Sequence, residues 1–284
     1  MAQTYSNWTA YCVNDGSRDS TAEILNSYAA NDERIKVFHT SNAGAASARN
    51  YALSKIQNEE WISFVDADDY VGPTMYESIL RAIHDSDVDY VRLFSQRTAE
   101  RYHHETLKYS RQEDIEKRVV SSESYFLNED VGGYTSNLFV KTALVKNNNL
   151  SFCKDMVMLE DQAFSITCAS VAKEILVIKE PRNYYYYSGN EYSITRNSKD
   201  TSNDIIRCVN IVYNALHSMG SEAVVNDYFY RKYLPIKLDA LYGNRLHYRH
   251  NKISEVILPE VKININLCMR TKLKRLIVRL LKLM

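Results

Sequence analysis

The fold is decided by the stretch WISFVDADDY at residues 61–70. Its first five residues are mostly β-branched or aromatic, which predicts a buried strand, and three carboxylates follow within four positions. Like charges this close repel one another unless a cation neutralises them, and carboxylate oxygens at the end of a strand suit Mg²⁺ or Mn²⁺ that also carries phosphate oxygens. We therefore expect Asp66 and Asp68 to hold a divalent metal ion beside a phosphate group.

The acidic stretch, taken alone, is also compatible with two different structures. One is a solvated turn, or an Asp cap on the helix that Pro73 predicts. The second is a haloacid-dehalogenase-type phosphatase, which begins with a strand followed by Asp-x-Asp. In that case Asp66 would be a nucleophile and Asp68 an acid or base.

Composition and charge exclude several classes of protein. The chain has 284 residues, of which 45% are hydrophobic and 25% charged, and its formal net charge is +0. Its composition is that of a globular protein, and with no net charge and no nucleic-acid motif we expect no nucleic-acid partner. The five cysteines include no Cys-x-x-Cys pair, which argues against a disulfide framework or a zinc site. No apolar run opens the sequence and no stretch reaches about 18 apolar residues, so we expect a cytoplasmic protein.

Strands and helices alternate along the first part of the chain, which predicts α/β architecture. In a mostly parallel, Rossmann-like sheet flanked by helices, ligands bind beyond the carboxyl ends of the strands. Three turns, Asp15-Gly16, Asn42-Ala43-Gly44 and Asp66-Ala67-Asp68, would then converge on one rim of the sheet. The predicted strands cover residues 8–13, 35–39, 61–65 and 88–94, and the predicted helices cover residues 21–30, 45–55 and 73–84.

Three motifs, in this order and spacing, carry a resemblance to a known family. They are VNDGSRDST at 13–21, NAG at 42–44 leading to SARN at 47–50, and FVDADD at 64–69. The set resembles family 2 of the inverting glycosyltransferases, which have the GT-A fold. It displaces the dehalogenase, for which Thr or Val is expected where this chain has Tyr70. The resemblance implies an enzyme that transfers a sugar from a nucleotide-diphosphate donor, with UDP expected, to a glycan or lipid-linked glycan in bacterial polysaccharide, O-antigen or capsule synthesis.

The resemblance also implies roles for individual donor-binding residues. Asp15 would accept a hydrogen bond from the nucleobase, and Arg49 would lie near the base or the phosphates. Asp66 would bind on the ribose side and beside the metal, Asp68 would ligate the Mn²⁺ or Mg²⁺ that bridges the diphosphate, and Asp69 would sit near the donor sugar. A divalent cation stabilises the charge that builds on the departing diphosphate. The residues expected at the nucleotide sugar or its metal are Asp15, Gly44, Arg49, Asp66, Asp68 and Asp69.

A second acidic pair, Glu160-Asp161, opens an amphipathic helix that we expect over residues 158–171. The helix dipole favours acidic residues in a first turn, and that alone can explain the pair. The resemblance implies instead that Asp161 is the general base for the acceptor hydroxyl and that Glu160 binds the acceptor or positions the base. The reverse assignment is open. Inversion needs one base opposite the leaving group and no covalent intermediate.

Residues 181–196, PRNYYYYSGNEYSITR, resemble the tyrosine-rich segment of the family that closes over the diphosphate. Many relatives have His or Arg shortly after the tyrosines, where this chain has Ser188-Gly189-Asn190. The resemblance therefore assigns the phosphate contact to Arg196. A β-hairpin with cross-strand tyrosines would also account for these residues, and the two interpretations are compatible.

The last segment has the pattern of a basic amphipathic helix. Apolar residues such as Leu273 and Leu280 fall on one helical face, Lys272 and Arg279 fall on the other, and no acidic residue follows Glu260. This pattern favours peripheral contact of residues 265–284 with the inner face of the plasma membrane, although a helix that docks on a partner protein has the same pattern.

We divide the chain into residues 1–95, the nucleotide-sugar-binding half of a GT-A domain, residues 96–197, the acceptor-binding half, and residues 198–284, a helical region. Family members begin with another strand, which we expect to be absent here because residues 1–8 match the segment that follows it. Its absence would leave backbone groups of the neighbouring strands unpaired. This motivates a rival hypothesis from another class, a truncated and non-catalytic GT-A-like module that acts as a partner protein.

Overall fold

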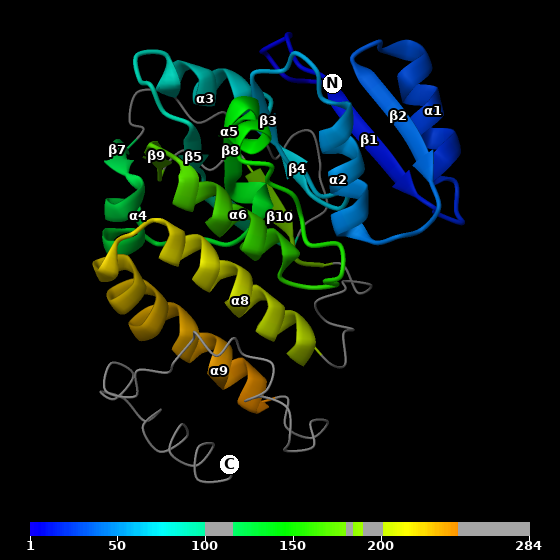
Figure 1. Cartoon of the computed structure of the whole chain (residues 1–284). Coiled ribbons are helices and arrows are strands. Elements are labelled where there is room, and N and C mark those ends of the chain that lie inside the picture. Colours follow the sequence, from blue (N-terminus) through cyan, green and yellow to red (C-terminus); the bar gives the residue numbers. More distant parts are fainter. Residues whose placement is uncertain (100–115, 180–183, 190–200, 244–284) are drawn as a thin grey trace.

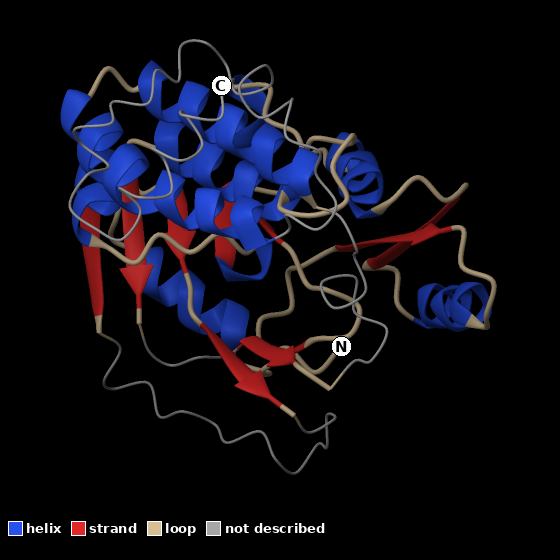
Figure 2. Cartoon of the chain, turned by 90° about the horizontal axis from the view of Figure 1, so that it is seen from below, coloured by secondary structure: helices blue, strands red, loops and turns tan. Residues whose placement is uncertain are grey.

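The structure is a computed structural model, and it describes residues 1–99, 116–179, 184–189 and 201–243 (Figure 1). The predicted α/β architecture is confirmed, because the central strands lie between helices (Figures 1 and 2). Arg196 and residues 265–284, for which we predicted a phosphate contact and a membrane contact, lie outside the described residues.

The N-terminal part forms a two-stranded parallel sheet with its own helices. Strand β1 (Ala10–Asp15) pairs with β2 (Ile35–Thr40), and helices α1 (Thr21–Asn31) and α2 (Ala45–Lys55) lie beside the pair. These elements occupy one side of the molecule (Figure 1). Helix α2 starts after Gly44, whose φ of 89° is a backbone conformation that other residues rarely adopt.

A five-stranded sheet forms the centre of the molecule. Its strand order is β3-β8-β5-β9-β7, and β5 and β9 are the only neighbouring strands in it that pair in parallel. The sheet is thus mixed, which corrects the expectation of a mostly parallel sheet, because β8 runs antiparallel between β3 and β5. The strands are β3 (Trp61–Ser63), β5 (Tyr90–Arg92), β7 (Lys117–Ser121), β8 (Leu138–Lys141) and β9 (Glu174–Ile178).

A three-stranded sheet joins segments that are far apart in sequence. Strand β10 (Tyr184–Tyr187) pairs antiparallel with β4 (Tyr70–Val71) and parallel with β6 (Ser95–Thr98). The rings of Tyr70 and Tyr185 stack with their centroids 4.8 Å apart. A cross-strand tyrosine pair is therefore present, but the β-hairpin considered above is not formed, because both neighbours of β10 are strands from earlier in the chain.

The central sheet has one hydrophobic core on each face because strand side chains alternate. Phe139 packs with helix α3 on one face, whereas Leu138 and Val140 pack with helices α4, α6 and α8 on the other. The helical elements next to the sheet are α3 (Met75–Ile83), α4 (Ser122–Asn128), the short 3-10 helix η3 (Thr135–Asn137), α5 (Thr142–Asn147) and α6 (Glu160–Val171).

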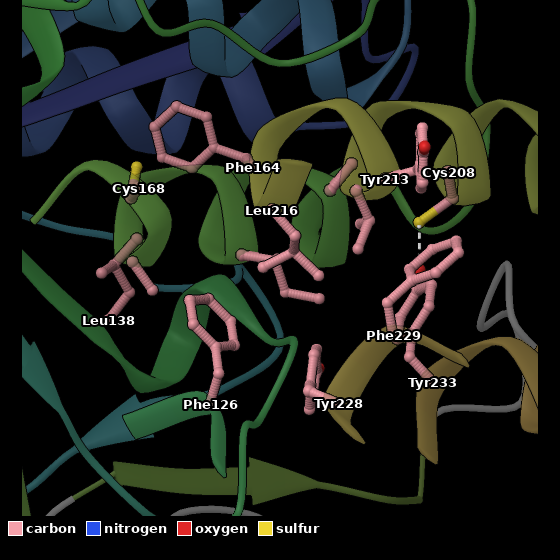
Figure 3. Close-up of a cluster of buried hydrophobic side chains, with 14 of the residues drawn as sticks. Phe126, Leu138, Phe164, Cys168, Cys208, Tyr213, Leu216, Tyr228, Phe229 and Tyr233 are labelled. Atoms are coloured by element: carbon pink, nitrogen blue, oxygen red, sulfur yellow. Dashed lines mark hydrogen bonds between the residues drawn. The ribbon is translucent and has the colours of Figure 1, made fainter. Parts of the chain in front are cut away.

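The C-terminal helices form a further layer on α6. They are α8 (Ser202–Ser218), the π-helix η4 (Val224–Tyr233) and α9 (Leu234–Gly243). Their buried side chains continue the larger core, including Leu216 and Phe229, which are both 0% exposed (Figure 3). Each such side chain contributes about 1.5–3 kcal/mol to folding, so this layer is part of one folded unit with the sheet. None of the helices in the described ranges has both the length and the apolar character needed to span a membrane.

Candidate functional site

The acidic turn follows β3 directly, as the sequence predicted. The backbone N–H of Asp69 donates to the carbonyl oxygen of Asp66 at 3.0 Å, which closes the turn. The side chain of Asp66 is 40% exposed and Asp68 is exposed. The turn therefore presents carboxylates to solvent at the carboxyl end of a core strand.

Asp69 differs from its neighbours because strand β10 uses both of its carboxylate oxygens. The hydroxyl of Tyr184 donates to Oδ2 at 2.7 Å, and the backbone N–H of Tyr187 donates to Oδ1 at 2.8 Å. The same Tyr184 oxygen accepts the backbone N–H of Asp66 at 3.1 Å. Burial raises the pKa of Asp69 and the charges of Asp66 and Asp68 add to this, while the two hydrogen bonds lower it. Asp69 thus anchors the acidic turn to β10.

Arg49 joins the acidic turn to the second acidic pair. It projects from α2 and donates through Nη2 to Asp66 Oδ1 at 2.9 Å and through Nη1 to Glu160 Oε1 at 2.7 Å. Burial alone lowers the pKa of Arg49, but the charges of Asp66 and Glu160 outweigh it and the pKa is raised. Since Glu160 is only 8% exposed, the guanidinium supplies the cation that a buried carboxylate requires.

Asp161 stands beside this ion-pair network in the first turn of α6. Burial raises its pKa to about 7, and the charge of Glu160 acts in the same direction. The backbone N–H of Gln162, which donates to Asp161 Oδ1 at 2.7 Å, and the charge of Arg49 act in the opposite direction. A carboxylate with a pKa near neutrality is well matched to general-base catalysis at neutral pH.

Asp15 is fixed at the start of α2. Its Oδ1 accepts the backbone N–H of Ala43 at 2.9 Å, and its Oδ2 accepts that of Gly44 at 2.7 Å. Gly16 permits the close approach of the two turns, because a Cβ on it would lie 2.7 Å from the backbone nitrogen of Asn42. The carboxylate of Asp15 is thus held at the start of α2.

Helix α2 brings the predicted regions together. Gly44 at its start contacts Asp15, and Arg49, about 7 Å further along the helix axis, contacts Asp66 and Glu160. We expected this convergence at the rim of one parallel sheet, but β1 and β3 belong to separate sheets. The helix between them provides the connection.

The residues of the acidic turn fit a metal ion that arrives with a phosphate ligand. Within the described ranges, no cluster of three or more His, Cys, Asp or Glu side chains forms a site that could enclose an ion. Mg²⁺ and Mn²⁺ commonly take one or two protein carboxylates and fill their other positions with phosphate oxygens and water. Asp66 and Asp68 provide oxygen ligands of that kind, so the donor set fits.

The partners of Asp69 were missed by the sequence reasoning. The run of four tyrosines drew attention to residues 184–187, but nothing in their spacing indicated that Tyr184 would bind Asp69, which lies 115 positions earlier. The ion pair between Arg49 and Glu160, separated by 111 positions, was missed for the same reason.

Comparison with known proteins gives matches in sequence and in fold. Residues 1–137 match the family described as Glycosyl transferase family 2. The chain is 30% identical over 202 residues to the uncharacterized glycosyltransferase EpsJ of Bacillus subtilis (strain 168), which covers 69% of this chain and 56% of that protein. It is 28% identical over 256 residues to the poly(ribitol-phosphate) beta-glucosyltransferase of Bacillus spizizenii, covering 87% of this chain and 36% of that protein. The chain thus spans about half the length of EpsJ.

The fold is similar to that of TarS from S. aureus. The crystal structure of TarS 1-349 in complex with UDP superposes with a TM-score of 0.77 at 20% identity, covering 99% of this chain and 80% of that one. The complex with UDP-GlcNAc gives a TM-score of 0.70 at 20% identity, with 94% and 72% coverage. These similarities show a GT-A fold.

Proposed function

This chain belongs to glycosyl transferase family 2 through residues 1–137, and we propose on that premise that it transfers a sugar from a nucleotide-diphosphate donor to a glycan or lipid-linked glycan acceptor, with inversion at the anomeric carbon. The observation that carries the proposal is the double ion pair of Arg49 with Asp66 and Glu160. Through it the acidic turn lies next to Glu160, the residue that precedes the candidate base Asp161. UDP is the proposed nucleotide, in keeping with the UDP and UDP-GlcNAc complexes of TarS.

The donor would lie along α2 and the acidic turn. Asp15, held by backbone N–H groups at the start of α2, is the proposed acceptor of a hydrogen bond from the nucleobase, and Gly44 belongs to the same turn. Asp66 and Asp68 would hold Mn²⁺ or Mg²⁺ against the diphosphate. When bound, such an ion neutralises charge on the leaving oxygens. Asp69, which we propose lies near the donor sugar, anchors this turn through its bonds to β10.

Asp161 is the proposed general base. Its carboxylate takes the proton of the acceptor hydroxyl as the acceptor oxygen bonds to the anomeric carbon and the bond from that carbon to the diphosphate oxygen breaks, releasing the nucleoside diphosphate. With a pKa raised to about 7, Asp161 is partly ionised at neutral pH and still basic enough to accept a proton. Glu160, neutralised by Arg49, would position the base or the acceptor.

We also propose peripheral contact with the cytoplasmic face of the membrane through residues 265–284, on the strength of their basic and apolar sequence pattern. Deleting these residues should shift the protein from the membrane fraction to the supernatant after cell lysis. Unchanged membrane association would contradict this assignment.

The proposed reaction is tested by binding and turnover of a panel of UDP-sugars in the presence of Mn²⁺. The wild type should bind UDP with Mn²⁺ and release it from one of the UDP-sugars. Asp68→Ala should lose metal-dependent UDP binding, whereas Asp161→Asn should keep binding and lose turnover. Asp227→Ala, which removes an exposed ion pair with Arg231 on η4, is the matched control and should behave as wild type. Absence of both UDP binding and turnover in the wild type would instead support the non-catalytic rival.

A further inference from the structure

The turn that presents the candidate base contains a strained residue. Leu159, which immediately precedes Glu160 and Asp161, has φ 65° and ψ 6°, a left-handed conformation. Residues with a Cβ rarely adopt it, and where they do so the surrounding structure holds them there. Something outside the turn must therefore stabilise this conformation.

The stabilising contacts come from α8. Asp204, in the first turn of α8, is 8% exposed, and its single oxygen Oδ2 accepts the backbone N–H groups of Val157 at 3.1 Å and Met158 at 3.0 Å. One turn further along, Arg207 donates a hydrogen bond to the carbonyl oxygen of Asp155. The segment that leads into the base is thus tied to α8 on both sides of Met156.

A second set of contacts reaches the other side of the base. The thiol of Cys208 lies 3.7 Å from the carbonyl oxygen of Leu159 and 3.1 Å from the hydroxyl of Tyr233 on η4 (Figure 3). That hydroxyl donates to Oε1 of Gln162 at 3.3 Å. Residues 159 and 162, which flank the acidic pair, are therefore both fixed by the C-terminal helical layer.

We propose that Asp204 is a positioning residue for catalysis: by accepting the two N–H groups of residues 157 and 158, it holds the left-handed turn at Leu159 and so aims Asp161 at the acceptor hydroxyl. The inference rests on the proposed function of Asp161 as the base. It adds a residue of α8, in the C-terminal helical layer, to the residues that serve catalysis.

Stabilisation of its own helix α8 does not explain the contacts of Asp204. An acidic residue in a first turn stabilises its own helix through the dipole. The contacts to Val157 and Met158, however, lie 47 and 46 positions away, on the segment before α6. Asp204 therefore connects two elements rather than capping one.

The test compares Asp204→Ala with Asp204→Asn in steady-state kinetics and in calorimetric binding of UDP with Mn²⁺. Because a single oxygen accepts both N–H groups, the amide oxygen of Asn can keep both bonds, so Asp204→Asn should retain activity within about threefold of wild type. Asp204→Ala should lower kcat about 10- to 100-fold, the effect of a misplacement of about 1 Å, with KM and Kd for the donor unchanged. Asp227→Ala again serves as the control on the same helical layer.

Three results would overturn the inference: wild-type kcat in Asp204→Ala, equal loss of kcat in the Ala and Asn variants, or a parallel loss of donor affinity. If Asp204→Ala does not fold, Asp204→Glu replaces it. This variant keeps the charge but displaces the oxygen by one methylene group, and it should lower kcat with little change in Tm. Wild-type kcat in Asp204→Glu would then overturn the inference. Full activity in Asp161→Asn would instead refute the proposed function, which keeps the two failures distinguishable.

Discussion

Replacing Asp161 by Asn should stabilise the protein at neutral pH while abolishing transfer. The pKa of Asp161 is raised from its ordinary value of 3.8 to about 7, first by burial and then by the charge of Glu160. A raised folded-state pKa means that the native state retains a proton that the unfolded state has released. The stability from this group is complete below the unfolded pKa and is lost as the pH rises through the folded one.

The magnitude follows from the width of that window. Just above pH 5 each pH unit removes about 1.4 kcal/mol from the free energy of unfolding, and this slope falls as Asp161 ionises near pH 7, so the total between pH 5 and pH 7 is about 2–3 kcal/mol. Asn carries no charge at either pH and keeps an oxygen for the N–H of Gln162. The variant should therefore gain about 2–3 kcal/mol over wild type on going from pH 5 to pH 7.

The assay is urea unfolding of both proteins at the two pH values, with EDTA present so that no metal binding contributes. The difference of differences isolates Asp161 from every other titrating group. Asp227→Asn, at an exposed position on η4, should change by less than about 0.5 kcal/mol and controls for the loss of one carboxylate. If the stability difference between Asp161→Asn and wild type is the same at pH 7 as at pH 5, the pKa of Asp161 is not raised. That result would also contradict the pKa argument for Asp161 as the base.

Three further outcomes are expected. Arg49→Met leaves Glu160 buried without its cation and frees Asp66, so denaturant unfolding should show a loss on the order of 3 kcal/mol, and transfer should fall. Unchanged stability would contradict the role of this double ion pair. Tyr184→Phe removes the hydroxyl that bonds Asp69 and the backbone of Asp66, and should weaken the free energy of UDP binding by about 1–2 kcal/mol in calorimetry. Wild-type affinity in this variant would contradict the role of Tyr184 in anchoring the acidic turn. Chelation with EDTA should weaken UDP binding, and added Mn²⁺ should restore it; binding that is insensitive to both would exclude a metal bridge.

Local features of the fold could be predicted because they depend on residues close in sequence. The helix predicted over residues 45–55 matches the bounds of α2, and Gly44 marked its start because its φ of 89° suits glycine. Strand β3 ends at Ser63, earlier than the predicted residue 65, because its pairing with β8 ends there. Local patterns fix such elements to within a few residues.

Sheet pairing and long-range contacts could not be predicted because they depend on residues far apart in sequence. The alternation of strands and helices indicated a mostly parallel sheet, yet β8, from residue 138 onward, runs antiparallel between β3 and β5. The same limit applies to the site. Its motifs gave Asp66 and Asp161 as candidates, while the contacts of Arg49 with Glu160 and of Asp204 with Val157 become visible only in three dimensions.

The anomeric configuration of the sugar first released from a UDP-α-sugar distinguishes a single displacement from a double one, and ¹H NMR can follow it in the absence of acceptor, with water taking the acceptor's place. A single displacement assisted by Asp161 predicts the β-anomer as the first product from wild type, and no release above background from Asp161→Asn. Initial release of the α-anomer, or equal release by the two proteins, would contradict a single displacement in which Asp161 is the general base.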